Sequence, residues 1–150
     1  MDMKTFKLTY MLFVAFFFMN GIAMAARVSV SVPVANVRSG PGETYAVLWK
    51  VERNHPFEII KTDRAWYRFR DFEGDRGWIH KSLVSKAPSV ITIKNTCNVR
   101  FEPNIKSDIL FTVEKGIPFK IVKKKGAWIN IKHADGDTGW IHKTVVWQPN

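Results

Sequence analysis

The sequence predicts an all-β protein made of two similar small units, and three observations support this prediction. Residues 34–84 align without a gap with residues 96–146 at a constant offset of 62, and 21 of these 51 positions are identical. Short runs of alternating apolar and polar residues are separated by Gly- and Pro-containing turns, as in small barrels and sandwiches. Within residues 26–150, no segment has the periodicity of an amphipathic helix. We therefore expect about five short strands in each unit.

The duplication is carried by short motifs that recur at the same spacing. An internal repeat of this size indicates two copies of one structural unit. We expect the units at residues 26–86 and 87–150, joined by a short linker that contains Pro88. Units of about 60 residues bury too little surface to be very stable alone, so contact between them would help. The recurring motifs are Asn-Val-Arg at 36–38 and 98–100, Trp66 and Trp128, and Gly-Trp-Ile-His-Lys at 77–81 and 139–143.

Residues 1–25 have the pattern of a secretory signal peptide. Lys4 and Lys7 precede an almost wholly apolar run at 8–19, and Ala23-Met24-Ala25 places small residues where a signal peptidase cleaves. The alternative is a retained membrane anchor, but the run is shorter than the roughly 20 residues that span a bilayer. We expect cleavage after Ala25, export to the periplasm or cell envelope, and no stable membrane anchor afterwards.

The chain that remains after cleavage is strongly basic. Residues 26–150 contain 21 Lys and Arg against 12 Asp and Glu, which gives a net charge of +9. A surface of this sign favours polyanions such as phosphate-rich envelope polymers or anionic lipid heads, or it serves solubility alone. Nucleic acid is not an expected partner of an exported protein.

The strand from Trp66 to Arg70 shows how the two faces of the predicted sheet differ. Tyr67 and Phe69 alternate with Arg68 and Arg70, and in the second copy Ile129 and Ile131 alternate with Asn130 and Lys132. Successive side chains of a strand point to opposite faces. One face is therefore apolar in both copies, and the other is polar except for Trp66 and Trp128.

These residues carry a family resemblance. The segments Asn-Val-Arg-Ser-Gly-Pro-Gly at 36–42, Trp-Tyr-Arg-Phe-Arg at 66–70 and Gly-Trp-Ile-His-Lys-Ser-Leu-Val at 77–84 resemble bacterial SH3-like (SH3b) domains. The tandem arrangement is similar to exported SH3-like proteins of Gram-negative bacteria. The resemblance implies a five-stranded β-barrel for each unit and a targeting or interaction module, often directed at cell-wall peptides. The second unit departs from it, because Phe-Glu-Pro-Asn at 101–104 replaces Ser-Gly-Pro-Gly at 39–42.

The candidate binding residues lie on the polar face. A tryptophan there offers a large apolar area and one hydrogen-bond donor to a ligand; alternatively, it closes a barrel end or seals the contact between the units. His80 and Leu83 stand where polyproline-binding relatives have Pro and Tyr, so we expect a groove for a different extended peptide. The candidate groove residues are Trp66, Trp128, Trp78, Trp140, Arg38, Arg68, His80 and His142.

Catalysis, cofactors and metals are not expected. The sequence contains no His-x-x-x-His pair, Cys-x-x-Cys pair or Gly-rich phosphate loop. Cys97 could act as a nucleophile, but its equivalent in the first unit is Ala35, which favours a core position. His133, Asp135 and Asp137 could hold a metal, but acidic hairpin turns are commonly solvated.

Three functions remain open. The first is recognition of peptidoglycan peptides in the cell wall. The second is a protein-interaction or scaffold module that holds an extended peptide of an envelope protein. The third is salt-sensitive binding of polyanions by the basic surface, because contacts between exposed charges are screened within about 10 Å at 0.1 M salt.

Overall fold

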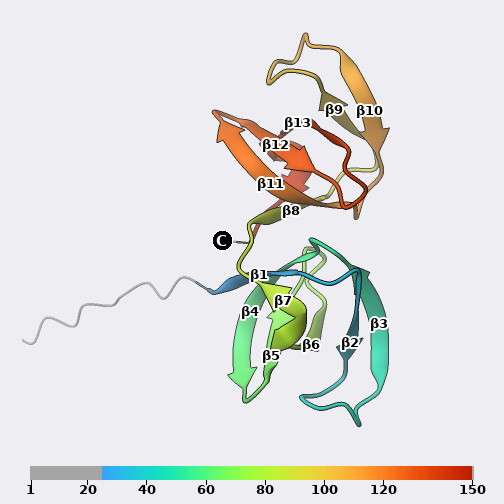
Figure 1. The fold of residues 1–150 in the computed structure, drawn as a ribbon, viewed down its shortest axis with the longest axis vertical. Helices are drawn as coiled ribbons and strands as arrows, with labels where there is room; N and C mark the ends of the chain where they lie inside the picture. Colours follow the sequence, from blue (N-terminus) through green and yellow to red (C-terminus); the bar gives the residue numbers. More distant parts are fainter. Residues whose placement is uncertain (1–24, 150) are drawn as a thin grey trace, which may run out of the picture.

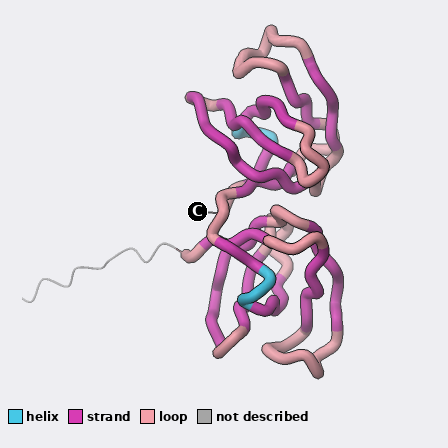
Figure 2. The backbone as a smooth tube through the Cα atoms, in the orientation of Figure 1, coloured by secondary structure: helices cyan, strands magenta, loops and turns pink. Residues whose placement is uncertain are grey.

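The structure, a computed structural model, describes residues 25–149 and contains two seven-stranded antiparallel sheets (Figures 1 and 2). The first sheet has the strand order β3-β2-β6-β5-β4-β1-β7. A short 3₁₀ turn, η1 (Lys81–Leu83), precedes its last strand. The strands are β1 (Arg27–Val30), β2 (Val34–Arg38), β3 (Val47–Glu52), β4 (Pro56–Asp63), β5 (Trp66–Arg70), β6 (Arg76–His80) and β7 (Val84–Ser85).

The second sheet repeats the first, with the order β10-β9-β13-β12-β11-β8-β14 and a 3₁₀ turn η2 (Lys143–Val145). Its long hairpin elements start and end 62 residues after their equivalents, as the sequence repeat predicts. Even the β-bulges correspond, since the register shifts at Ile60 in β4 and at Val122 in β11. The strands are β8 (Ser89–Thr92), β9 (Cys97–Arg100), β10 (Ile109–Val113), β11 (Pro118–Lys125), β12 (Trp128–Lys132), β13 (Thr138–His142) and β14 (Val146–Trp147).

Each sheet wraps around one apolar core. In the first unit, Val51 from the edge strand β3 and Val28 from β1, near the opposite edge, belong to the same buried cluster. Phe57 and Phe69 stack at its centre, with ring centroids 3.8 Å apart. The second unit has an equivalent cluster around Phe119, Ile131 and Ile141. Burial of these side chains drives each sheet to curl around them, because only one face of each sheet is apolar.

The strand count corrects the five strands that we expected. β1 lies in the segment Val28–Val32, where apolar and polar residues alternate, but it ends at Val30. The strand β7 follows η1 and pairs with β1. It has only two residues, which are too few for an alternating pattern to be recognised in the sequence. The all-β class and the hairpin from Trp66 to His80 are confirmed.

The two units touch each other, as the short linker predicted (Figure 1). Phe72, in the β5–β6 turn, lies within 3.9 Å of the position that a Cβ at Gly116 would occupy, and Lys115 Nζ lies 5.9 Å from the Phe72 ring centroid. Lys115 also forms an ion pair with Glu73 at 3.7 Å. All four residues of β8 are buried, including Ile91, which belongs to neither apolar core cluster. The contact therefore joins the β5–β6 turn of one unit to the β10–β11 turn of the other.

The expected signal peptide lies almost wholly outside the described residues. The structure begins at Ala25, and Ala26 already accepts a hydrogen bond at 2.8 Å from the backbone N–H of Ile59. In the part of the chain from residue 25 to 149, no helix has the length and apolar character to cross a bilayer.

Candidate functional site

Trp66 and His80 meet on the outer face of the first sheet. They are direct cross-strand partners on β5 and β6, and their rings meet edge to face with centroids 5.1 Å apart. Tyr67 and Phe69 point the other way and pack on or in the core. Trp66 is only 9% exposed, so most of its ring is covered by neighbours rather than by solvent. The alternation that we predicted for this strand therefore positions the indole next to an imidazole.

The imidazole of His80 is fixed by the turn that follows it. His80 is the N-cap of η1, and its Nδ1 accepts a hydrogen bond at 3.1 Å from the backbone N–H of Ser82. The Ser82 hydroxyl lies 2.7 Å from the same nitrogen. Because Nδ1 is an acceptor, the neutral ring carries its proton on Nε2, which leaves an N–H donor for a ligand.

A small cavity opens beside this pair, and we call it groove 1. Its volume is ≈ 270 Å³, whereas the cavity between the units, described below, has a volume of ≈ 390 Å³. It lies between the η1 turn and the loop that joins β2 to β3. Its lining residues are Asn36, Arg38, Glu43, Trp66, His80, Ser82 and Leu83.

The second unit has the equivalent cavity, groove 2, with a volume of ≈ 670 Å³. Every lining residue of groove 1 has its counterpart, 62 positions later, in groove 2. Trp128 and His142 repeat the edge-to-face contact at 5.1 Å, and His142 Nδ1 accepts from the backbone N–H of Thr144 at 3.3 Å. The lining residues are Thr96, Asn98, Arg100, Pro103, Asn104, Ile105, Trp128, His142, Thr144 and Val145.

Arg38 and Arg100 have a structural task at the edge of their grooves. Arg38 Nη1 donates to the backbone carbonyls of Glu43 at 3.0 Å and Tyr45 at 2.9 Å. Arg100 Nη1 donates to the carbonyl of Ser107 at 2.8 Å. Each arginine thus holds the loop that follows its strand, β2 or β9, and it also lines its groove.

The other predicted residues lie beside the grooves. Trp78 is the direct partner of Arg68 on β5 and of Arg38 on β2, two register pairs away from Trp66, and it does not line groove 1. Trp140 occupies the equivalent place, where Lys123 Nζ lies 5.6 Å from its ring centroid. The structure therefore brings together Trp66, His80 and Arg38 in one groove and Trp128 and His142 in the other. It leaves Arg68, Trp78 and Trp140 on the adjoining sheet face.

Some groove residues were absent from the sequence prediction. Asn36 and Asn98 line the two cavities, and Ser82 and Thr144 hold the imidazoles. The signal that could have identified Asn36 was present, because the Asn-Val-Arg motif repeats and alternation puts Asn36 on the same face as Arg38.

The chemistry of the grooves suits hydrogen-bond acceptors. Each combines an indole, an imidazole N–H, an asparagine amide and a guanidinium around an apolar wall. Extended peptide backbones and carboxylates present the matching carbonyl and carboxylate oxygens. The aromatic ring supplies contact area, and the fixed donors supply orientation.

The alternative chemistries have little support within residues 25–149. Cys97 is buried in the second core, where its Sγ lies 3.4 Å from the Lys94 carbonyl, and burial raises the pKa of the thiol. A buried thiol of raised pKa is a poor nucleophile. His133 pairs with Asp135 at 2.9 Å, but the described residues contain no cluster of three side chains that could hold a metal.

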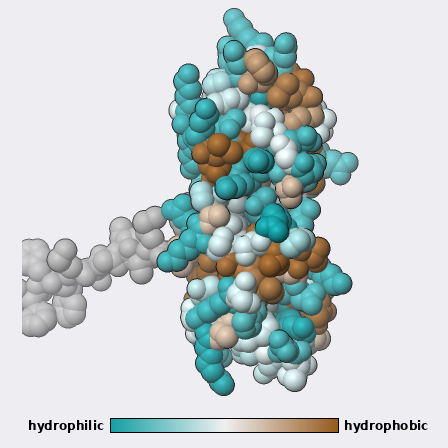
Figure 3. Space-filling view, in the orientation of Figure 1, coloured by the Kyte–Doolittle hydropathy of each residue, from teal (hydrophilic) through white to brown (hydrophobic). Residues whose placement is uncertain are grey.

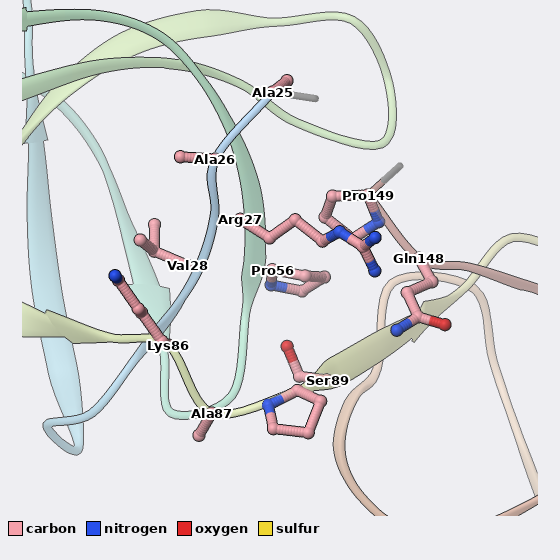
Figure 4. A pocket seen from close by; sticks show the side chains of 11 residues that line it. Ala25, Ala26, Arg27, Val28, Pro56, Lys86, Ala87, Ser89, Gln148 and Pro149 are labelled. Carbon is pink, nitrogen blue, oxygen red and sulfur yellow. The ribbon is translucent and has the colours of Figure 1, made fainter. Parts of the chain in front are cut away.

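A further cavity of ≈ 390 Å³ lies between the units, at the point where β1 starts. Figure 4 shows the Arg27 side chain reaching toward Gln148 and Pro149, whereas Lys86 points away from it. The two cations of this cavity therefore do not converge, and the rest of its lining is mostly Ala and Pro. It lacks the fixed donors and aromatic walls that the two grooves have.

Comparison with known proteins identifies the kind of unit that carries these grooves. The family model described as bacterial SH3 domain matches residues 31–86 and again residues 94–148. The Bacillus subtilis (strain 168) protein "Putative N-acetylmuramoyl-L-alanine amidase YrvJ" is 26% identical over 122 residues, which are 74% of this chain and 23% of that protein. "Probable cell wall amidase LytH" of Staphylococcus epidermidis is 36% identical over 61 residues, or 40% of this chain and 21% of that protein.

The chain thus spans less than a quarter of the length of these curated relatives. Among solved structures, an NlpC/P60 family protein from Bacillus cereus is similar at 12% identity and a TM-score of 0.38, over 81% of this chain and 56% of that one. The similarity to a structure titled "Endolysin LysPBC5 CBD" has a TM-score of 0.32 at 12% identity, over 83% of this chain and 94% of the other. Structural likeness at this level adds nothing to the sequence matches.

Proposed function

The chain belongs to the bacterial SH3 domain family, and from that premise we propose that it is a non-catalytic cell-wall-binding module in which at least one of the two grooves recognises extended peptides of peptidoglycan. The observation that carries the proposal is the pair of equivalent grooves, each built from an indole, an imidazole fixed by a 3₁₀ turn, an asparagine and an arginine. We further propose that the chain is exported and acts in the periplasm or cell envelope.

The names of the relatives also support a role at the cell wall. Two relatives are named as amidases, one of N-acetylmuramoyl-L-alanine and one of the cell wall, and this chain matches less than a quarter of each. The match to the first of them covers 74% of this chain and the match to the second covers 40%. A binding role is also consistent with the burial of Cys97, which removes the one thiol from contact with a substrate.

Binding to isolated peptidoglycan tests the proposal directly. The chain from Ala26 onward would be sedimented with purified sacculi across a salt series, beside Trp66→Ala and Trp128→Ala. Trp78→Ala and Trp140→Ala are matched controls, because they remove the same side chain from the sheet face just outside each groove. Trp66→Phe keeps an aromatic ring in the nearly buried site but removes the indole N–H and part of the ring, and urea unfolding of every variant separates lost recognition from lost stability.

We expect binding that resists salt and that falls in at least one of the two groove variants but not in the controls. Such a result would also show which unit holds the wall site. Binding that disappears with salt in every variant alike would instead support attraction of polyanions to the basic surface. No binding at any salt concentration would refute the wall proposal.

A further inference from the structure

The two grooves differ at one central position. Six of the seven equivalent pairs keep their chemical character, from Asn36 and Asn98 to Leu83 and Val145. The seventh pair does not, because Glu43 in groove 1 is replaced by Ile105 in groove 2. Ile105 is 68% exposed although it is one of the more apolar side chains of the protein. An exposed isoleucine at a binding groove indicates an apolar contact that is not filled within the described chain.

The loop beside each groove also differs between the two units. In the first unit, Tyr45 lies so close to Gly40 that a Cβ there would be 2.3 Å from its ring, and it also contacts Gly42. The second unit has Glu102, Asn104 and Ser107 at these three positions. No aromatic ring folds back onto the loop there, and the cavity is ≈ 670 Å³ rather than ≈ 270 Å³.

Groove 2 also continues into an apolar surface. Trp128, Pro103 and Val145 line it together with Ile105. Phe101, at the base of the same loop, is 65% exposed, and Ile109 and Leu110 on β10 are each 48% exposed. Figure 3 shows apolar surface gathered over the β9–β10 part of the upper unit. This surface offers a bulky apolar side chain more contact than groove 1 does.

The charges of the two grooves differ as well. Groove 1 is lined by one cation, Arg38, and one anion, Glu43. The described lining of groove 2 contains Arg100 and no acidic residue. Arg100 uses Nη1 to hold the carbonyl of Ser107, and its other N–H groups are donors that a carboxylate can pair with.

We propose that groove 2 binds an extended segment of another protein that carries a bulky aliphatic or aromatic side chain next to a carboxylate. Ile105 and Trp128 receive the apolar side chain, and Arg100 pairs with the carboxylate. Groove 1 disfavours this ligand, because its cavity is smaller and Glu43 repels the carboxylate. The inference shares with the proposed function only the premise that the grooves hold extended peptides, and it assigns the two units different ligands.

Two capped peptides test this inference with the chain from Ala26 onward. The probes are acetyl-Ala-Leu-Asp-Ala-amide and acetyl-Ala-Ala-Asp-Ala-amide, added to millimolar concentration while the indole N–H signals of Trp128 and Trp66 are followed by NMR. The protein variants are Ile105→Glu, which gives groove 2 the residue of groove 1, and the converse control Glu43→Ile. A third peptide with Ala in place of Asp tests the role of Arg100.

The Leu peptide should shift the Trp128 signal and leave the Trp66 signal in place. Removing the Leu side chain should weaken binding by at least about tenfold, the factor expected for burial of such a side chain, and Ile105→Glu should have a similar effect. The inference is overturned if the two peptides bind equally, if Trp66 responds as strongly as Trp128, or if Trp128 does not respond.

Sedimentation with sacculi separates this inference from the wall proposal. The peptide titrations and the sedimentation are scored separately in the unaltered protein, so that binding to sacculi tests the wall proposal alone. Loss of sacculus binding in Ile105→Glu would make groove 2 the wall site and would overturn the inference while supporting the wall proposal. Binding of the Leu peptide by a protein that ignores sacculi would refute the wall proposal and leave the inference standing.

Discussion

Trp66 and His80 face each other across β5 and β6 with their ring planes at 88°, and the same contact recurs at 84° between Trp128 and His142. The histidine links the groove to the turn that closes it, because its Nδ1 accepts the N–H of Ser82 or Thr144 while its ring edge supports the indole. The repeated Gly-Trp-Ile-His-Lys motif therefore includes the residue that holds the tryptophan in place.

Replacing His80 tests this linking role. His80→Ala removes the acceptor for the Ser82 N–H and the contact with Trp66, and we expect it to lower the free energy of unfolding by about 1 kcal/mol. His80→Asn keeps an acceptor at the same N-cap position and should lower it by less. Urea unfolding of the three proteins measures both values. Equal losses in the two variants would show that the Nδ1 hydrogen bond contributes nothing.

His55 gives the protein a predictable response to acid. Burial lowers the pKa of His55 from 6.5 to about 4, its Nε2 is buried without a hydrogen-bond partner in the described chain, and its ring packs against Phe57 and Phe72. Between pH 6.5 and 4 the unfolded chain therefore binds a proton at this site that the folded chain does not. As the pH falls through this window, protonation of His55 in the unfolded chain lowers the free energy of unfolding. Below the window, His55 causes no further change.

His55→Ile is the matched variant, because the equivalent residue of the second unit is Ile117. The free energy of unfolding at pH 7 minus that at pH 4.5 should be smaller in the variant by roughly 2 kcal/mol, from a shift of this size. Urea unfolding at the two pH values measures the difference. Asp71, whose pKa burial raises, acts in the opposite direction in both proteins and cancels in the comparison. An unchanged pH dependence would contradict the assignment.

The sequence predicted those parts of the molecule that rest on local pattern and on duplication. Alternation along Trp66–Arg70 and the equivalent spacing of His80 were sufficient to place both side chains on one outer face. Trp78 and Arg68, two register pairs away, lie on the same face but outside groove 1, because alternation gives a face but not which part of that face is hollow. The position of the cavity depends on the β2–β3 loop, which comes from a distant part of the chain.

Contacts that break the repeat could not be predicted. Phe72 has Ala134 as its counterpart and Tyr45 has Ser107, so the duplication says nothing of either. Phe72 lies in the contact between the units and Tyr45 packs against Gly40 and Gly42 in the β2–β3 loop, and both contacts depend on which segments the fold brings together. A search for aromatic residues present in only one copy would have singled out both.

Phe72 should couple the stability of the two units. Phe72→Ala removes its contacts with His55, Lys115 and Gly116, and we expect a loss of about 1–2 kcal/mol and separation of the thermal unfolding into two transitions. Glu73→Ala removes only the exposed ion pair with Lys115 and should cost at most about 0.5 kcal/mol. Differential scanning calorimetry follows both, and a single unshifted transition in Phe72→Ala would show that the units unfold together for another reason.

Gly77 and Gly139 begin the motif that carries the groove histidines His80 and His142, and space is the reason for glycine there. A Cβ at Gly77 would lie 2.3 Å from Val37 Cγ1, and a Cβ at Gly139 would lie 2.4 Å from Val99 Cγ1. Both valines are fully buried, so neither can move away without displacing the core. Gly77→Ala and Gly139→Ala should therefore each lower the free energy of unfolding by about 1–3 kcal/mol.

A second substitution distinguishes overlap from a backbone effect. Val37→Ala opens the space that the new methyl group needs, so the double variant Gly77→Ala/Val37→Ala should be more stable than the sum of the two single losses predicts. Val99→Ala, in the other unit, removes the same side chain far from Gly77 and should add to Gly77→Ala without any gain. Chemical denaturation of the single and double variants gives the coupling energy between residues 37 and 77, and a value near zero would mean that Gly77 is required for a reason other than the proximity of Val37.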